Sequence, residues 1–144
     1  MDMDVVIRVE DNSQKILQEF EQATDRALYA MGIKAVEGSV NAISGKYTID
    51  PAVDTGRLRA SISFITPTQS GEAQVAKPPN AKEEDKLTGK AEENSVIVGS
   101  NVEYAEKIHN GDRGMAGRPF LRVGIDQTKD VMKSQVEKIF KGEL

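Results

Sequence analysis

The chain contains no cysteine and no tryptophan, and His109 is its only histidine. The lack of cysteine excludes a disulfide framework and any zinc site built on thiolates. A single imidazole also leaves little room for a catalytic triad, because such a site needs a base that an acid orients. Stability must therefore come from a buried core, which a chain of 144 residues can form as a single domain over residues 1–144.

Long apolar runs and net positive charge are also missing. No stretch approaches the roughly 20 apolar residues that a membrane helix requires. The acidic start, Met1–Asp4, lacks the basic and apolar regions of a signal peptide. We therefore expect a protein that is soluble and cytoplasmic when made, without membrane association. The net charge of −4 argues against a general nucleic-acid binder, although the stretch from Lys107 to Arg122 is locally basic.

A long apolar stripe predicts the largest element of the fold. Val5–Val9 is a β-branched run that predicts an opening strand. Apolar residues then recur every three or four positions until Ser44–Gly45, where glycine suits the end of a helix. They include Ile16, Leu17, Phe20, Ala23, Ala27, Leu28, Met31 and Ala35. An unbroken helix would span about 45 Å, so Gly32 and Gly38 bend or split it, or part of it packs against a neighbouring subunit. We favour one bent helix.

The remainder of the chain alternates short elements with a polar segment. Residues 67–95 are rich in Pro, Gly, Ser, Lys and Glu, which predicts a long mobile loop inserted in the domain. The other predicted elements are a helix over 57–61, strands over 62–65 and 95–100, a helix over 102–109, a glycine-rich loop over 112–117 and a helix from Pro119 to about Lys141. This order predicts an α+β domain in which a long N-terminal helix and a C-terminal helix pack on a small antiparallel sheet.

Candidate chemistry is sparse. His109 lies beside Asn110 and Gly111 at a predicted helix end, where an interaction with the helix dipole explains it better than catalysis. Asp50 and Asp54 resemble paired acid/base carboxylates, but Asp54 has a sufficient role as a turn or cap residue. The acidic run over residues 83–85 falls in the predicted loop, so solvated charges are favoured over a metal site. We expect no enzymatic activity and no cofactor.

The basic stretch allows two interpretations. Its glycine-rich loop lacks the Lys-Ser/Thr of a P-loop and does not follow a strand. Arg113, Arg118 and Arg122 would contact phosphates if the protein were a DNA-binding regulator. Alternatively they pair with carboxylates across a subunit interface, which suits the planar guanidinium group. We favour the interface.

Three blocks of sequence, taken in order, resemble one family. They are Pro-Ala-Val-Asp-Thr-Gly-Arg-Leu-Arg-Ala-Ser-Ile over 51–62, Val-Ile-Val-Gly-Ser-Asn-Val-Glu-Tyr-Ala over 96–105, and Gly111, Gly114-Met115 and Arg-Pro-Phe-Leu-Arg over 118–122. This pattern resembles the HK97 gp10-like family of tailed-phage neck and tail-completion proteins, over about residues 12–140. The chain departs from the family at Gly117, where alanine is common, and at Val123–Gly124, which replaces a frequent Pro-Ala.

The resemblance implies a small α+β structural subunit without catalytic residues. Such subunits form a ring, commonly a hexamer, between the capsid connector and the tail tube. The partners would be copies of the chain, neck or connector proteins and the tail tube protein, and DNA would pass through the ring without specific binding. The location would be the virion, after assembly in the host cytoplasm. A phage assembly factor or a DNA-binding regulator using Lys107–Arg122 is the alternative.

The matching blocks also suggest roles for particular residues. Candidate subunit-interface residues are Arg57, Tyr104, Arg118, Phe120 and Arg122. Packing of Tyr104 and Phe120 inside the domain core is equally compatible with the sequence. Candidate turn or capping residues are Asp54, Thr55 and Gly56. Candidate residues of a partner-binding loop are Lys77, Lys82, Glu83, Glu84 and Asp85.

Overall fold

The computed structural model describes residues 13–47, 56–68 and 82–143. The elements are α1 (Ser13–Ile43), α2 (Arg57–Ser61), β1 (Ser63–Ile65), the 3-10 helix η1 (Glu83–Asp85), β2 (Ile97–Gly99), α3 (Ala105–Asn110), β3 (Gly111–Asp112), β4 (Met115–Ala116) and α4 (Phe120–Phe140). This is an α+β fold with long N-terminal and C-terminal helices and a small antiparallel sheet, which confirms the predicted class. The predicted strand over Val5–Val9 lies outside the described residues.

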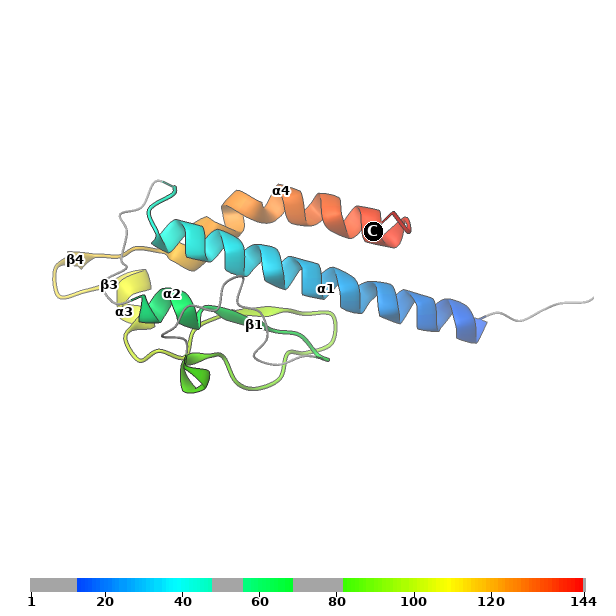
Figure 1. Ribbon diagram of the computed structural model, residues 1–144, viewed down its shortest axis with the longest axis horizontal. Helices are drawn as coiled ribbons and strands as arrows, with labels where there is room; N and C mark the ends of the chain where they lie inside the picture. The colour runs from blue at the N-terminus through cyan, green and yellow to red at the C-terminus, as the bar shows by residue number, and fades with distance from the viewer. Residues whose placement is uncertain (1–12, 48–55, 69–81, 144) are drawn as a thin grey trace, which may run out of the picture.

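The central element is α1, a helix of 31 residues that neither Gly32 nor Gly38 splits. In Figure 1, α4 runs along one side of α1, while α2 and β1 lie on the other side. Buried residues begin at Ala23 and continue to Ile43, whereas residues 13–22 are all exposed. Among the described residues, other elements therefore cover α1 from both sides over its later turns, whereas its first turns are exposed.

Two glycines allow α1 and α4 to approach each other closely. A Cβ atom added at Gly38 would overlap the carbonyl oxygen of Gly124, and one added at Gly124 would overlap the backbone of Gly38 and Ser39. Ser39 is fully buried at this crossing, and its hydroxyl donates to the carbonyl of Ala35 at 2.7 Å. The missing side chain of Gly124 is thus what lets the two backbones meet.

The main sheet has two strands, β1 and β2, which pair antiparallel with Phe64 opposite Val98. All three residues of β1 are buried beneath α1, whereas Ile97 of β2 is 42 % exposed. The Phe64 ring fills the space left by Gly32 and meets Tyr29 edge-on, with ring centroids 5.4 Å apart. The largest buried cluster consists of Val36, Ala42, Ile43, Leu58, Ile62, Phe64, Val102 and Phe120.

A second, smaller sheet replaces the glycine-rich loop that the sequence predicts. β3 and β4 form an antiparallel hairpin, with Arg113 and Gly114 as its two turn residues. Their φ angles are 48° and 81°, and a type I′ turn requires positive φ at both positions. Arginine is uncommon there because its Cβ crowds the backbone in the left-handed region. The hairpin holds Arg113 and Met115 at its tip.

Two further predictions need correction. Residues 82–95 are not part of a mobile loop, because they contain η1 and two buried side chains, Asp85 and Ala91. The helix predicted from residue 102 begins at Ala105 and ends at Asn110. Gly111 follows it with φ 89° and ψ 161°, an extended conformation with positive φ and not the left-handed cap that commonly ends a helix.

The helix crossing predicts that replacing Gly124 by alanine lowers stability, whereas helix propensity alone predicts a gain. Replacing glycine by alanine inside a helix ordinarily gains about 1 kcal/mol. Gly124→Ala should instead lower the free energy of unfolding by about 1–3 kcal/mol, because its Cβ overlaps the backbone of α1. Urea unfolding followed by circular dichroism measures this change. The control is Ser134→Ala on an exposed position of α4, which should stay within about 0.5 kcal/mol. A Gly124→Ala variant that is more stable than the unmodified protein would contradict the close approach of the α1 and α4 backbones.

Candidate functional site

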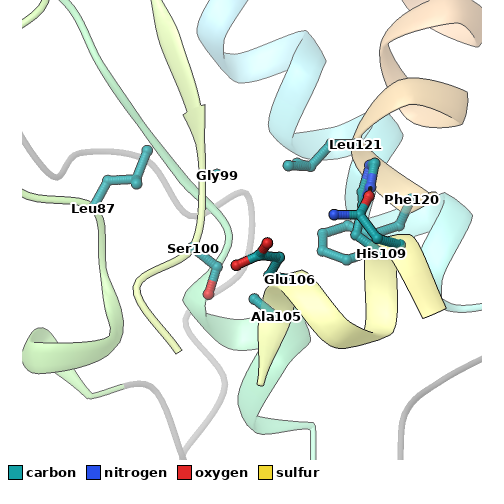
Figure 2. Close-up of a pocket in the computed structure, with 9 residues that line it drawn as sticks. Leu87, Gly99, Ser100, Ala105, Glu106, His109, Phe120 and Leu121 are labelled. Atoms are coloured by element: carbon teal, nitrogen blue, oxygen red, sulfur yellow. Dashed lines mark hydrogen bonds between the residues drawn. The ribbon is translucent and has the colours of Figure 1, made fainter. Parts of the chain in front are cut away.

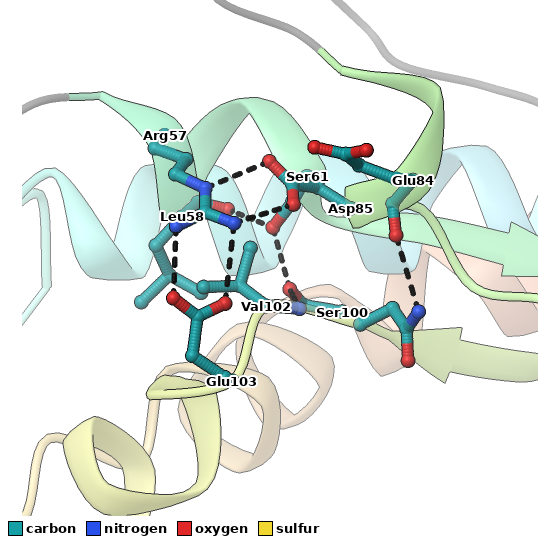
Figure 3. A network of polar contacts seen from close by, with 9 residues as sticks. Arg57, Leu58, Ser61, Glu84, Asp85, Ser100, Val102 and Glu103 are labelled. Carbon is teal, nitrogen blue, oxygen red and sulfur yellow. Dashed lines mark hydrogen bonds and ion pairs between the residues drawn. The ribbon is translucent and has the colours of Figure 1, made fainter.

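Arg57 is the centre of a polar network that joins three segments of the chain (Figure 3). Its Nε and Nη2 donate to the two carboxylate oxygens of Asp85 at 2.9 and 2.8 Å. Its Nη1 and Nη2 donate to those of Glu103 at 3.0 and 3.1 Å. The guanidinium carbon also lies 5.8 Å from the ring centroid of Tyr104, within cation–π range. We call Arg57, Asp85, Glu103 and Tyr104 the arginine node.

The two carboxylates of the arginine node differ in exposure. The Asp85 side chain is 3 % exposed and that of Glu103 is 71 % exposed. The hydrogen bonds from Arg57 hold the pKa of Asp85 below its ordinary value, against the opposing effect of burial. The pKa of Glu103 is also lowered, first by its own backbone N–H and then by Arg57. Hydrogen bonds with Asp85 and then Glu103 raise the pKa of Arg57. All three groups are therefore charged at neutral pH.

The segment around Asp85 is fastened to the rest of the fold by backbone contacts as well. The N–H of Asn101 donates to the Asp85 carbonyl at 2.9 Å, and its side-chain amide donates to the Glu84 carbonyl at 3.1 Å. The N–H of Leu87 donates to the hydroxyl of Ser63 at 2.9 Å. The assignment of Asp85 to a partner-binding loop is therefore wrong, because its carboxylate is buried and committed to Arg57.

The other candidate loop and turn residues are placed as follows. Lys82 and Glu84 are exposed, and Glu83 begins η1. Gly56 stands at the N-terminal cap of α2 with φ 72° and ψ −3°, and no side chain caps that helix. The left-handed conformation of Gly56 agrees with the predicted turn. Asp54, Thr55 and Lys77 lie outside the described residues.

Three of the five candidate interface residues pack in the core or form hydrogen bonds within the chain. Phe120 is 1 % exposed and belongs to the main core, so its ring is not a surface anchor. Tyr104 is half-buried against the same core. The Nε, Nη1 and Nη2 groups of Arg57 already donate to acceptors within the chain. Phe120 is therefore a core residue, whereas the interface role of Arg57 and Tyr104 stays a prediction beside their contacts within the chain.

The remaining two candidates are placed differently. The Nε of Arg118 is buried and has no hydrogen-bond acceptor among the described residues, while its backbone N–H donates to the carbonyl of Ile108 at 2.7 Å. Arg122 is exposed in the first turn of α4. Both stay candidates for contact with a partner, and in the sequence Arg118 follows the end of β4 by two residues.

A pocket of about 280 Å³ opens between β2, α3 and the start of α4 (Figure 2). Glu106 and His109 are the titratable side chains in its lining. The His109 Nδ1 lies 3.0 Å from the side-chain oxygen of Asn110, and the ring meets Phe120 edge-on at 5.3 Å between centroids. The partner of His109 is thus an amide and not an orienting carboxylate. This geometry assigns His109 a packing role at the end of α3.

The sequence left open that part of the long helix packs against a neighbouring subunit, but it did not show which part is exposed: among the described residues it is the start of α1. Ile16, Leu17 and Phe20 are 61 %, 57 % and 59 % exposed, although they lie on the stripe that continues into the core. The ring of Phe20 meets that of Phe140, itself 45 % exposed, at 5.6 Å. The lengths of the two predicted helices could have indicated this exposure, because α4 has 21 residues and cannot lie along all 31 residues of α1.

In the part of the chain that the structure describes, histidine and acidic side chains form no cluster of three that suits a metal ion. Neither of the long helices in this part of the chain has an apolar stretch suited to crossing a bilayer. Comparison of the chain with protein-family models, curated proteins and solved structures finds no match. Function must therefore be inferred from the chain's own sequence blocks and contacts.

The arginine node predicts unequal effects for its two carboxylates. Asp85→Ala should lower the free energy of unfolding by roughly 2 kcal/mol, because it removes two charge-assisted hydrogen bonds from a buried position. Glu103→Ala is the matched control on the same guanidinium, and it should cost much less because that carboxylate is exposed to water. Urea unfolding at pH 7 compares the two variants. Equal losses would show that burial of Asp85 does not strengthen its pairing.

The same contact predicts a dependence of stability on pH. A carboxyl whose pKa is lowered by folding contributes stability above its unfolded pKa, about 4, and loses that contribution as pH falls toward its folded pKa. The stability difference between the unmodified protein and Asp85→Asn should thus be full at pH 6 and shrink below pH 4. Urea midpoints measured across this range test it. A difference that stays constant down to pH 2 would exclude the Asp85 carboxylate as its source.

Proposed function

We propose that the chain is a structural subunit of a tailed-phage particle, a ring-forming neck or tail-completion protein between the connector and the tail tube. The three sequence blocks that resemble HK97 gp10-like proteins support this assignment. The protein acts through its shape and its interfaces with copies of itself and with neighbouring particle proteins.

The observation that carries the proposal is that the three blocks meet in one core. Leu58 and Ile62 come from the first block, Val102 from the second and Phe120 from the third, and each is at most 4 % exposed. The first two blocks are also joined at the surface, because Arg57 pairs with Glu103. The residues behind the resemblance therefore form the framework of one domain, as expected if they define a shared fold.

The exposed surface supports a role in assembly. The bare start of α1 presents three large apolar side chains to solvent, and single-chain proteins seldom leave such a cluster uncovered. A subunit whose neighbours cover this surface removes it from water. The net charge of −4 suits a ring through which DNA passes without sticking, since binding to DNA depends on neutralising phosphates.

Cryo-electron microscopy of the intact phage particle tests the proposal. We expect a ring of the chain between the connector and the tail tube, with a symmetry that the reconstruction gives directly. Particles assembled without the chain should accumulate as separate heads and tails, and complementation with the chain should restore joining. Absence of the chain from mature particles would overturn the proposal. Salt-sensitive DNA binding by the purified protein would then point to a DNA-binding regulator.

A further inference from the structure

A groove of about 310 Å³ lies at the bare start of α1. Leu17, Phe20 and Leu28 supply its apolar lining. All charged residues in its lining are acidic, and they are Glu21, Asp25 and Glu93. Leu17 and Phe20 remain 57 % and 59 % exposed. The occupant that this groove fits best carries an apolar side chain next to positive charge.

The β3–β4 hairpin has that combination. Met115 is 46 % exposed at its tip, beside the exposed turn residue Arg113. Arg113 holds a left-handed φ of 48°, a position that glycine or asparagine occupies with less crowding. The surrounding stretch from Lys107 to Arg122 contains four basic residues and the single acidic residue Asp112. Groove and hairpin are thus complementary in both polarity and charge.

The groove and the hairpin lie at opposite ends of the molecule. In Figure 1 the first turns of α1 form one end of the long axis, and β3 and β4 form the other. Helix α1 alone separates Phe20 from Ile43 by roughly 35 Å, and in Figure 1 the hairpin lies beyond the C-terminal end of α1. The hairpin of a molecule therefore cannot enter its own groove, but it can enter that of another copy.

We propose that the β3–β4 hairpin of one copy docks in the α1 groove of the next. Met115 packs on Leu17 and Phe20, while Arg113 faces Glu21 and Asp25. Contacts between opposite ends are heterologous, and they close into a ring when the rotation between copies divides a full turn. This contact would join neighbouring subunits of the proposed ring. It rests on the proposed neck function only for where that ring lies in the phage particle.

The docked hairpin is a small contact, so its affinity in solution is low and its specificity comes from charge. Covalent trapping suits such a contact, and the absence of native cysteine means that every disulfide reports an introduced pair. The experiment mixes a Phe20→Cys variant with a tagged Met115→Cys variant under mild oxidation. We expect mixed dimers on a non-reducing gel, and a ladder of higher multimers when one chain carries both cysteines.

The matched control replaces Met115→Cys by Val131→Cys, because Val131 is 47 % exposed but lies on α4. Mixed dimers with this control should be rare. Adding Arg113→Glu to the Met115→Cys chain should lower cross-linking at least about tenfold, since like charges then face each other. Adding Glu21→Arg to the Phe20→Cys chain should restore it. Cross-linking equal to the Val131→Cys control, or failure of the charge swap to restore it, would overturn the inference.

The remaining outcomes separate this contact from the proposed function. One such outcome is a ring of the chain in the particle together with a Phe20→Cys variant that cross-links to a surface other than the hairpin. This outcome would overturn the hairpin contact but leave the proposed neck function standing. The opposite outcome is a ladder of cross-linked multimers together with absence of the chain from phage particles. It would support the contact between hairpin and groove but overturn the proposed neck function. Mixed dimers that form only after deletion of residues 1–12 would identify the chain's own first residues as the occupant of the groove, and they would also overturn the inference.

Discussion

The close approach of α1 and α4 at Gly38 and Gly124 is the constraint on which the rest of the structure depends. Because neither residue has a side chain, the two backbones come close together, and this contact holds the start of α4 against α1. Phe120, the first residue of α4, is thereby placed in the main core. The hairpin that immediately precedes α4 is in turn directed to one end of the molecule. A second cluster around Ile139 closes the helix pair farther along.

The charged residues of the arginine node stabilise the fold. A carboxylate as buried as Asp85 is costly to remove from water unless a cation and further hydrogen bonds compensate. Arg57 supplies the cation, and Glu103 and Tyr104 hold its guanidinium group in place. The arginine that looked like an interface residue therefore works as an internal clamp. It ties the segment over 82–101 to α2.

The two ends of the molecule have the opposite character, because each leaves apolar side chains in water. At one end the start of α1 forms an apolar groove with an acidic lining. At the other end the hairpin presents Met115 and Arg113 from a strained turn. Complementary ends are the arrangement that the proposed head-to-tail contact requires. The residues that stabilise the domain thus differ from those of the proposed contact between copies.

The sequence by itself determined the class of fold and the approximate position of each described α-helix, because helical periodicity is a local property. Only the tertiary structure decided which of these residues are buried. Phe20 and Ala27 share one stripe, yet Phe20 stays exposed because α4 ends beside it at Phe140 and continues no farther along α1. Asp85 lies in a polar segment, yet it is buried because its partner Arg57 stands 28 positions away. Burial depends on such distant neighbours, which no local pattern contains.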